Sequence, residues 1–107
     1  VMGHRFADMD CLGAAVGICC IARRLDRRAR IVMDPKDNAC GPMIEALKKN
    51  KEYADIFITP TAAMVAANSR SLLVVVDTNR PDNVEDEALL QTINRVAVID
   101  HHRRAAS

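Results

Sequence analysis

The spacing of apolar residues changes several times along the chain. Short continuous apolar runs, which predict β-strands, alternate with stretches whose apolar residues recur every three or four positions, which predict α-helices. Such alternation is typical of a βαβ series. The predicted strands cover residues 1–3, 30–34, 56–58, 71–77 and 96–100, and the predicted helices cover residues 10–28, 43–51, 61–68 and 84–94.

The predicted strand 71–77 contains an uninterrupted apolar run from Leu72 to Val76. A strand whose two faces are both covered carries such a run, so this strand belongs in the middle of a parallel sheet. We therefore predict an α/β fold with a doubly wound, mainly parallel, five-stranded sheet and helices on both faces. Numbered along the chain, the expected strand order is 3-2-1-4-5.

The predicted helix 10–28 carries two glycines, Gly13 and Gly17, four residues apart. Residues with this spacing lie on the same side of a helix. Because glycine allows a close approach between elements, the spacing predicts close packing of this helix on the sheet.

Length, charge and cysteine spacing narrow the class of protein. The chain has 107 residues, 50% of them hydrophobic, which is enough for one domain with its own core. A formal net charge of +1 argues against a broad polyanion-binding surface, so we expect no duplex nucleic acid partner. No apolar run reaches the roughly 18 to 20 residues of a membrane span, so this segment is not expected to be membrane-inserted. Four cysteines without C-x-x-C spacing predict reduced thiols of a cytoplasmic protein: Cys11, Cys19, Cys20 and Cys40.

Polar motifs follow three of the predicted strands, in segments 4–10, 77–81 and 100–104. In open α/β sheets the carboxyl ends of the strands form the ligand-binding edge, so we expect these motifs to meet there. Their titratable residues would repel one another or stay unpaired without a cation. The residues in question are His4, Asp8, Asp10, Asp77, Asp100, His101 and His102.

A site for two divalent ions would satisfy this group of side chains. Asp8 and Asp10 can point to different ions, and Asp77 can bridge two ions about 3.5 to 4 Å apart, the arrangement used in phosphoryl hydrolysis. Imidazole and carboxylate ligands without thiolate suit manganese, magnesium or iron better than structural zinc. Taken singly, each motif has a simpler explanation: Asp10 is a natural helix N-cap and Asp77 a turn former. Their convergence favours the metal site.

The same residues resemble the first three motifs of the DHH phosphoesterases over nearly the whole chain. Segments 2–18, 77–81 and 100–104 are similar to the DHH domain of membrane-anchored cyclic-di-AMP phosphodiesterases. The resemblance implies a manganese-dependent phosphodiesterase that hydrolyses cyclic-di-AMP to a linear dinucleotide through a hydroxide bridging two Mn²⁺ ions, with Mg²⁺ or Fe²⁺ as alternatives. It also implies a role in nucleotide signalling.

The resemblance further implies a role for each motif residue. His4 and Asp8 would ligate one metal, Asp10 and His101 the other, and Asp77 both. The implied catalytic residues are Asp77, His101 and His102, and the implied substrate-binding residues are His102, Arg80, Arg103 and Arg104. Asp100 would fix the tautomer of an imidazole rather than bind metal.

The chain departs from the family pattern at Asn79, where many relatives have histidine. We expect a fourth acidic motif and a companion substrate-binding domain to lie beyond Ser107. Residues 1–107 would then be the N-terminal part of a DHH domain, truncated at both ends, with weak metal binding and little or no turnover of its own. The parent would be anchored in the membrane with this domain on the cytoplasmic side.

Two other classes of function remain open. A nanoRNA hydrolase or an inorganic pyrophosphatase of the same superfamily would use the same ligands. A non-catalytic nucleotide-binding regulatory module would bind its ligand without consuming it. The sequence also leaves open a homodimer.

Overall fold

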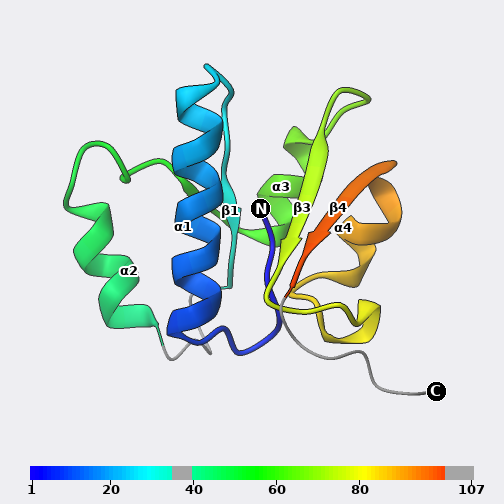
Figure 1. Cartoon of the computed structure of the whole chain (residues 1–107), viewed down its shortest axis with the longest axis horizontal. Coiled ribbons are helices and arrows are strands. Elements are labelled where there is room, and N and C mark those ends of the chain that lie inside the picture. The colour runs from blue at the N-terminus through cyan, green and yellow to red at the C-terminus, as the bar shows by residue number, and fades with distance from the viewer. Residues whose placement is uncertain (35–39, 101–107) are drawn as a thin grey trace.

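Helices and strands alternate within residues 1–34 and 40–100, which the computed structural model describes, so the predicted mixture of helix and strand is confirmed. Figure 1 shows their arrangement. In chain order the elements are α1 (Met9–Arg24), β1 (Ile31–Val32), α2 (Gly41–Lys48), β2 (Phe57–Ile58), α3 (Pro60–Ala66), β3 (Leu72–Val76), the short 3-10 helix η1 (Pro81–Asn83), α4 (Glu87–Thr92) and β4 (Arg95–Ile99).

The strands pair in parallel as two two-stranded sheets, β1 with β2 and β3 with β4. The segment before α1 lies between the two pairs, because Met2 forms isolated parallel bridges with Val32 of β1 and Val75 of β3. The Met2 amide donates to the Val74 carbonyl at 2.9 Å, and the Val76 amide donates to the Met2 carbonyl at 3.0 Å.

The predicted five-stranded sheet is not confirmed, since the first segment pairs through isolated bridges rather than as a strand. The reason is local. Two residues after Met2, His4 forms an antiparallel bridge with Val84, so the chain leaves the parallel direction almost at once. The segment therefore has no length over which a regular ladder could form.

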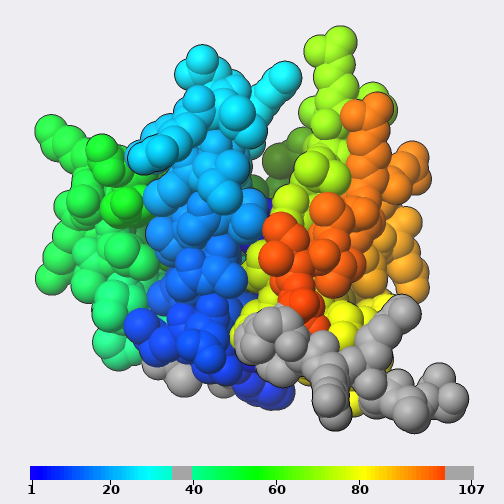
Figure 2. All heavy atoms as spheres, in the orientation of Figure 1, coloured from blue at the N-terminus to red at the C-terminus, as the bar shows by residue number. Residues whose placement is uncertain are grey.

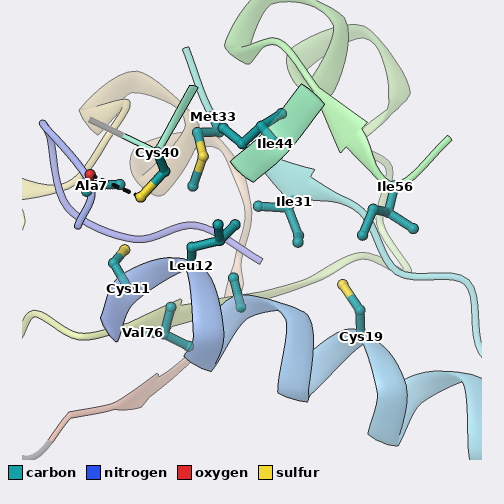
Figure 3. Packing of buried hydrophobic residues seen from close by; sticks show 11 residues of the cluster. Ala7, Cys11, Leu12, Cys19, Ile31, Met33, Cys40, Ile44, Ile56 and Val76 are labelled. Atoms are coloured by element: carbon teal, nitrogen blue, oxygen red, sulfur yellow. Dashed lines mark hydrogen bonds between the residues drawn. The ribbon is translucent and has the colours of Figure 1, made fainter. Parts of the chain in front are cut away.

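Two hydrophobic clusters cover opposite faces of the strands, because successive strand residues point to opposite sides. Ile31 belongs to the cluster that packs against α1 and α2, and the next residue, Val32, belongs to the cluster under α3 and α4. Figure 3 shows Leu12 and Cys19 of α1 reaching toward Ile31. Helices thus lie on both sides of the strands, as predicted.

Helix α1 is shorter than predicted and begins earlier. The N-cap is Asp8 rather than Asp10, and its carboxylate accepts a hydrogen bond from the Cys11 amide. The helix ends before Asp26, which takes a left-handed backbone conformation with φ of 56°. The Arg27 amide then donates to the Ala22 carbonyl at 2.8 Å and closes the last turn.

The prediction for the glycines of α1 is wrong. Gly13 and Gly17 are both exposed, and a Cβ atom placed on either would meet no heavy atom within 4 Å. The face of α1 that packs on the strands consists of bulkier residues instead, namely Cys11, Leu12, Ala15 and Cys19.

Helix α3 lies close to its predicted range, whereas helix α4 is shorter than predicted. Thr59 caps α3, with its hydroxyl accepting from the Ala62 amide at 3.2 Å. Helix α4 begins only at Glu87, because Val84 is buried and bridges His4 rather than continuing a helix. Strand β4 is largely exposed, and Figure 2 shows its orange and red atoms at the surface. None of the helices in the described parts of the chain is long and apolar enough to cross a membrane.

Candidate metal centre

Polar residues from distant parts of the sequence meet where β3 ends and α1 begins. In Figure 1 the start of α1 and the ends of β3 and β4 lie at the same edge of the molecule. The segment after Met2 brings His4 to this edge, the start of α1 brings Asp8, and the end of β3 brings Asp77. The predicted convergence of the first two motifs is therefore present.

Asp77 is the most enclosed charged residue of this edge. It follows β3 directly, only 6% of its surface is exposed, and its backbone is left-handed with φ of 59°. Its amide donates to the Ile99 carbonyl at 3.1 Å, which ties the ends of β3 and β4 together. A carboxylate this far removed from water acts strongly on any charge beside it.

His4 lies directly against Asp77, with its Nε2 atom 3.1 Å from Asp77 Oδ2. The other ring nitrogen, Nδ1, lies 2.8 Å from the Arg5 carbonyl oxygen, which can only accept a hydrogen bond. The Asp77 carboxylate also only accepts, so the neutral ring can donate to one of these two partners at a time; with the proton on Nδ1, the lone pair of Nε2 would face the carboxylate. A proton or a metal cation between Nε2 and Asp77 would make this contact favourable.

Asp8 completes the acidic side of the group. Its Oδ1 atom lies 3.7 Å from His4 Nε2 and accepts from the Cys11 amide at 2.9 Å. The hydrogen bond from the Cys11 amide lowers the pKa of Asp8, and the nearby His4 and Asp77 side chains lower it further. Asp8 is thus held as a carboxylate at the start of α1, with most of its side chain exposed.

This set of donors suits a divalent cation. His4 Nε2 lies 3.1 Å from a carboxylate oxygen of Asp77 and 3.7 Å from one of Asp8, and a proton on Nδ1 would leave Nε2 available to a metal. Two carboxylates beside one imidazole also leave an excess of negative charge that a cation would neutralise. Asp8, His4 and Asp77 therefore fit the metal implied by the sequence.

A fourth donor, Cys11, was missed in the sequence analysis. Its Sγ atom, His4 and Asp77 offer ligand atoms that all lie within 4.8 Å of one another. Burial raises the pKa of the Cys11 thiol to about 11, while the His4 amide donates to it and acts in the opposite direction. The thiol reaches this position only because residue 3 is glycine: a Cβ on Gly3 would lie 2.0 Å from the sulfur. The sequence indicated a place for Cys11 near the site only through its position directly after Asp10, a predicted metal ligand.

Glu85 is a second residue that the sequence analysis missed. It is half-buried, its amide donates to the Gly3 carbonyl at 2.9 Å, and its Oε1 atom accepts from the Asp34 amide at 3.0 Å. Burial raises the pKa of Glu85, and the charge of Asp34 adds to this effect. Glu85 thus connects the loop after β1 to the segment that carries His4. The sequence around Glu85 gave no indication of a role in the site, apart from its position just before α4.

The other predicted site residues lie outside this group. Asp10 is exposed in the first turn of α1; like Asp8 it is outside the described group of close donor atoms, and it lacks the 3.7 Å contact with His4 that Asp8 makes. Arg80 is exposed, and its guanidinium holds Asp82 through contacts of 2.9 and 3.3 Å. Asp100 is partly buried directly after β4. Four further predicted residues lie outside the described residues, so their roles stay predictions: His101, His102, Arg103 and Arg104.

These residues lie in a domain that matches a known family. All residues from 1 to 107 match the family model of the DHH family, N-terminal domain. The chain belongs to the DHH family. The resemblance noted in the sequence is thereby confirmed.

Curated relatives match almost the whole of this DHH domain. The chain is 43% identical to the cyclic-di-AMP phosphodiesterase GdpP of Bacillus subtilis (strain 168) over 97% of its length, and 39% identical to the cyclic-di-AMP phosphodiesterase PdeA of Listeria monocytogenes serotype 1/2a over 98%. It covers 16% of the length of each. A protein of Enterococcus faecalis named as a probable manganese-dependent inorganic pyrophosphatase is 29% identical over 98% of this chain and 31% of its own length.

Proposed function

We propose that this DHH domain is part of a metal-dependent phosphodiesterase that hydrolyses a cyclic dinucleotide, cyclic-di-AMP, to a linear dinucleotide. The observation that carries the proposal is the contact of His4 Nε2 with the buried Asp77 carboxylate at 3.1 Å, with Asp8 beside it. Membership of the DHH family and the two relatives named cyclic-di-AMP phosphodiesterases support the choice of substrate.

Each motif residue has a proposed place around two manganese ions, with Mg²⁺ or Fe²⁺ as alternatives. His4 and Asp8 would hold one ion, Asp10 and His101 the other, and Asp77 both. When bound, the ions would supply positive charge to the phosphate and lower the pKa of a water molecule. His102 and the arginines would contact the phosphate, with Arg80 first exchanging its contact with Asp82.

The residues of the chain contribute mainly by holding position. Asp77 has a left-handed backbone, and the hydrogen bond from its amide to the Ile99 carbonyl holds this residue at the edge where the strands end. The Arg5 carbonyl fixes the His4 ring with Nε2 toward Asp77. Because Asp77 is almost fully removed from water, its charge acts on a bound cation with little screening.

The proposed activity is that of the whole protein, because this chain covers only 16% of the length of the two phosphodiesterase relatives. We propose that residues 1–107 alone bind metal weakly and turn over little substrate. A companion domain would supply the surface that positions the nucleotide. The parent would place the domain on the cytoplasmic side of a membrane, and a homodimer is left open.

The test is hydrolysis of cyclic-di-AMP by the full-length protein with Mn²⁺, comparing Asp77→Asn with Asp26→Asn. Both aspartates have a left-handed backbone, with φ of 59° and 56°, and asparagine tolerates this conformation. Asp77→Asn should lower kcat more than about 100-fold, because losing even a group behind the metal ligands costs about 10- to 100-fold. Asp26→Asn, at the exposed far end of α1, should leave the rate within about twofold.

Substrate comparison separates this function from its rivals. Short linear RNA and pyrophosphate are offered in parallel, since one relative is named as a pyrophosphatase. Faster hydrolysis of pyrophosphate or linear RNA would move the assignment within the superfamily. Binding of cyclic-di-AMP with no linear product from the wild type, or equal rates in the two aspartate variants, would contradict the proposal.

A further inference from the structure

Cys11 changes the chemistry of the group formed by His4 and Asp77. The ligands predicted from the sequence include no thiolate, and they suit manganese, magnesium or iron better than structural zinc. In the structure the Cys11 sulfur, a His4 ring nitrogen and an Asp77 carboxylate oxygen all lie within 4.8 Å of one another. A nitrogen, an oxygen and a sulfur donor together are typical of zinc, which takes three protein ligands and leaves one position open in catalytic sites.

The separations of these atoms are close to those of a tetrahedral site. With metal–ligand distances of about 2.0 to 2.3 Å, two ligand atoms of a tetrahedron lie about 3.4 to 3.6 Å apart. His4 Nε2 and Asp77 Oδ2 are 3.1 Å apart, and no pair of the three atoms exceeds 4.8 Å. Adjustments of roughly 1 Å would therefore enclose one ion.

The surrounding backbone holds the thiol in this place. Gly3 leaves the space that the sulfur fills, since a Cβ there would lie 2.0 Å from Sγ. Cys11 also lies in the first turn of α1, where the unpaired amides of a helix favour an anionic ligand. The Cys11 side chain is completely buried, so the packing around it holds the sulfur in this position.

We propose that Cys11 joins His4 and Asp77 as the third protein ligand of a site for thiophilic divalent ions such as Zn²⁺ and Co²⁺. As the metal–sulfur bond forms, the thiol proton passes to solvent. The site shares His4 and Asp77 with the proposed manganese centre, so the two kinds of metal compete for it. Cys11 gives the protein a preference for Zn²⁺ over Mn²⁺ that carboxylates and imidazoles alone would not give.

The test is titration of the reduced protein with Co²⁺, followed by absorption spectroscopy. A thiolate ligand produces an intense sulfur-to-cobalt charge-transfer band in the near ultraviolet, and a tetrahedral site produces strong visible bands. Both should appear in the wild type and disappear on addition of Zn²⁺. Cys11→Ser should lose the charge-transfer band and bind Zn²⁺ at least tenfold more weakly, while its affinity for Mn²⁺ stays within about twofold.

Two cysteine variants serve as matched controls. Cys20→Ser changes an exposed cysteine of the same helix, and Cys40→Ala changes a buried cysteine whose Sγ lies 3.5 Å from the Ala7 carbonyl oxygen. Both variants should keep the charge-transfer band. A circular dichroism spectrum checks that each variant is folded.

X-ray absorption of the zinc-loaded wild type needs no variant and should show one sulfur at about 2.3 Å. A bound Co²⁺ or Zn²⁺ ion without a sulfur ligand would overturn the proposal, as would a charge-transfer band that persists in folded Cys11→Ser. Mn²⁺-dependent hydrolysis of cyclic-di-AMP by the wild-type full-length protein tests the proposed function separately. A cobalt band that depends on Cys11 would support the present proposal whether or not the wild type hydrolyses cyclic-di-AMP.

Discussion

The two sides of helix α1 differ in how closely they approach the rest of the molecule. On the inner side, Cys11 is so close to Gly3 that one added carbon there would overlap its sulfur. On the outer side, Gly13 and Gly17 have open space where their side chains would be. The same residue type is therefore required at one position and replaceable at the others. A close approach that requires glycine thus occurs beside the edge that carries His4 and Asp77 and not on the outer side of α1.

The largest expected effect is on the inner side. Gly3→Ala places a Cβ 2.0 Å from Cys11 Sγ, and overpacking of this kind costs about 1 to 3 kcal/mol of the free energy of unfolding. In a Cys11→Ala background, the nearest remaining neighbours of that Cβ are the Val76 carbonyl oxygen at 3.6 Å and the Cβ of residue 11 at 3.8 Å, which are ordinary contacts. Urea unfolding of the four proteins measures both steps.

The double-variant comparison tests whether the cost comes from the sulfur. Gly3→Ala should cost less than about 0.5 kcal/mol once Cys11 is alanine, because the two changes share one contact. An equal cost in both backgrounds would show that the Gly3 backbone, rather than its neighbour, requires glycine. The contrast between the two sides of α1 would then lose its physical basis.

The sequence predicted the local features of the fold well. The alternation of helices and strands follows from the spacing of apolar residues. The meeting of His4, Asp8 and Asp77 follows from the rule that parallel strands end at one edge. The start of α1 was harder, since Asp8 and Asp10 are both capping types. Only the position of the Cys11 amide decides between them.

Features that depend on how elements far apart in the sequence pack together could not be predicted from the spacing of residues. The spacing of Gly13 and Gly17 is compatible with either side of α1, and only the packed structure shows which side faces solvent. The closeness of Cys11 to Gly3 depends on how α1 sits on the strands. Pairing of the first segment through isolated bridges at Met2 likewise depends on where the chain turns.

A smaller effect on the free energy of unfolding is expected at the start of α1, where the Asp8 side chain caps the helix. Asp8→Ala should cost about 1 kcal/mol near neutral pH, because the Cys11 amide loses its acceptor. The pKa of Asp8 is lowered in the folded protein, so its contribution is fully present above its usual value of 3.8 and is lost as the pH falls through the folded pKa. Urea unfolding of wild type and variant over a pH series measures this dependence.

Thr59→Ala is the control for the cap at Asp8. It removes a cap of the same kind from α3, where an uncharged hydroxyl accepts from the Ala62 amide. The cost of Thr59→Ala should not change across the acid range in which the cost of Asp8→Ala falls. A cost of Asp8→Ala that stayed constant down to strongly acidic pH would show that its charge adds nothing to the cap.

The smallest effect, and one of opposite sign, is expected on the outer side of α1. Gly13→Ala should raise the free energy of unfolding by about 0.5 to 1 kcal/mol, because alanine loses less backbone entropy in a helix and nothing stands within 4 Å of the new methyl group. Gly17→Ala should do the same, and the two gains should add. Urea unfolding provides the values. A loss of stability at either position would mean that this surface is covered in solution, and the two sides of α1 would no longer differ.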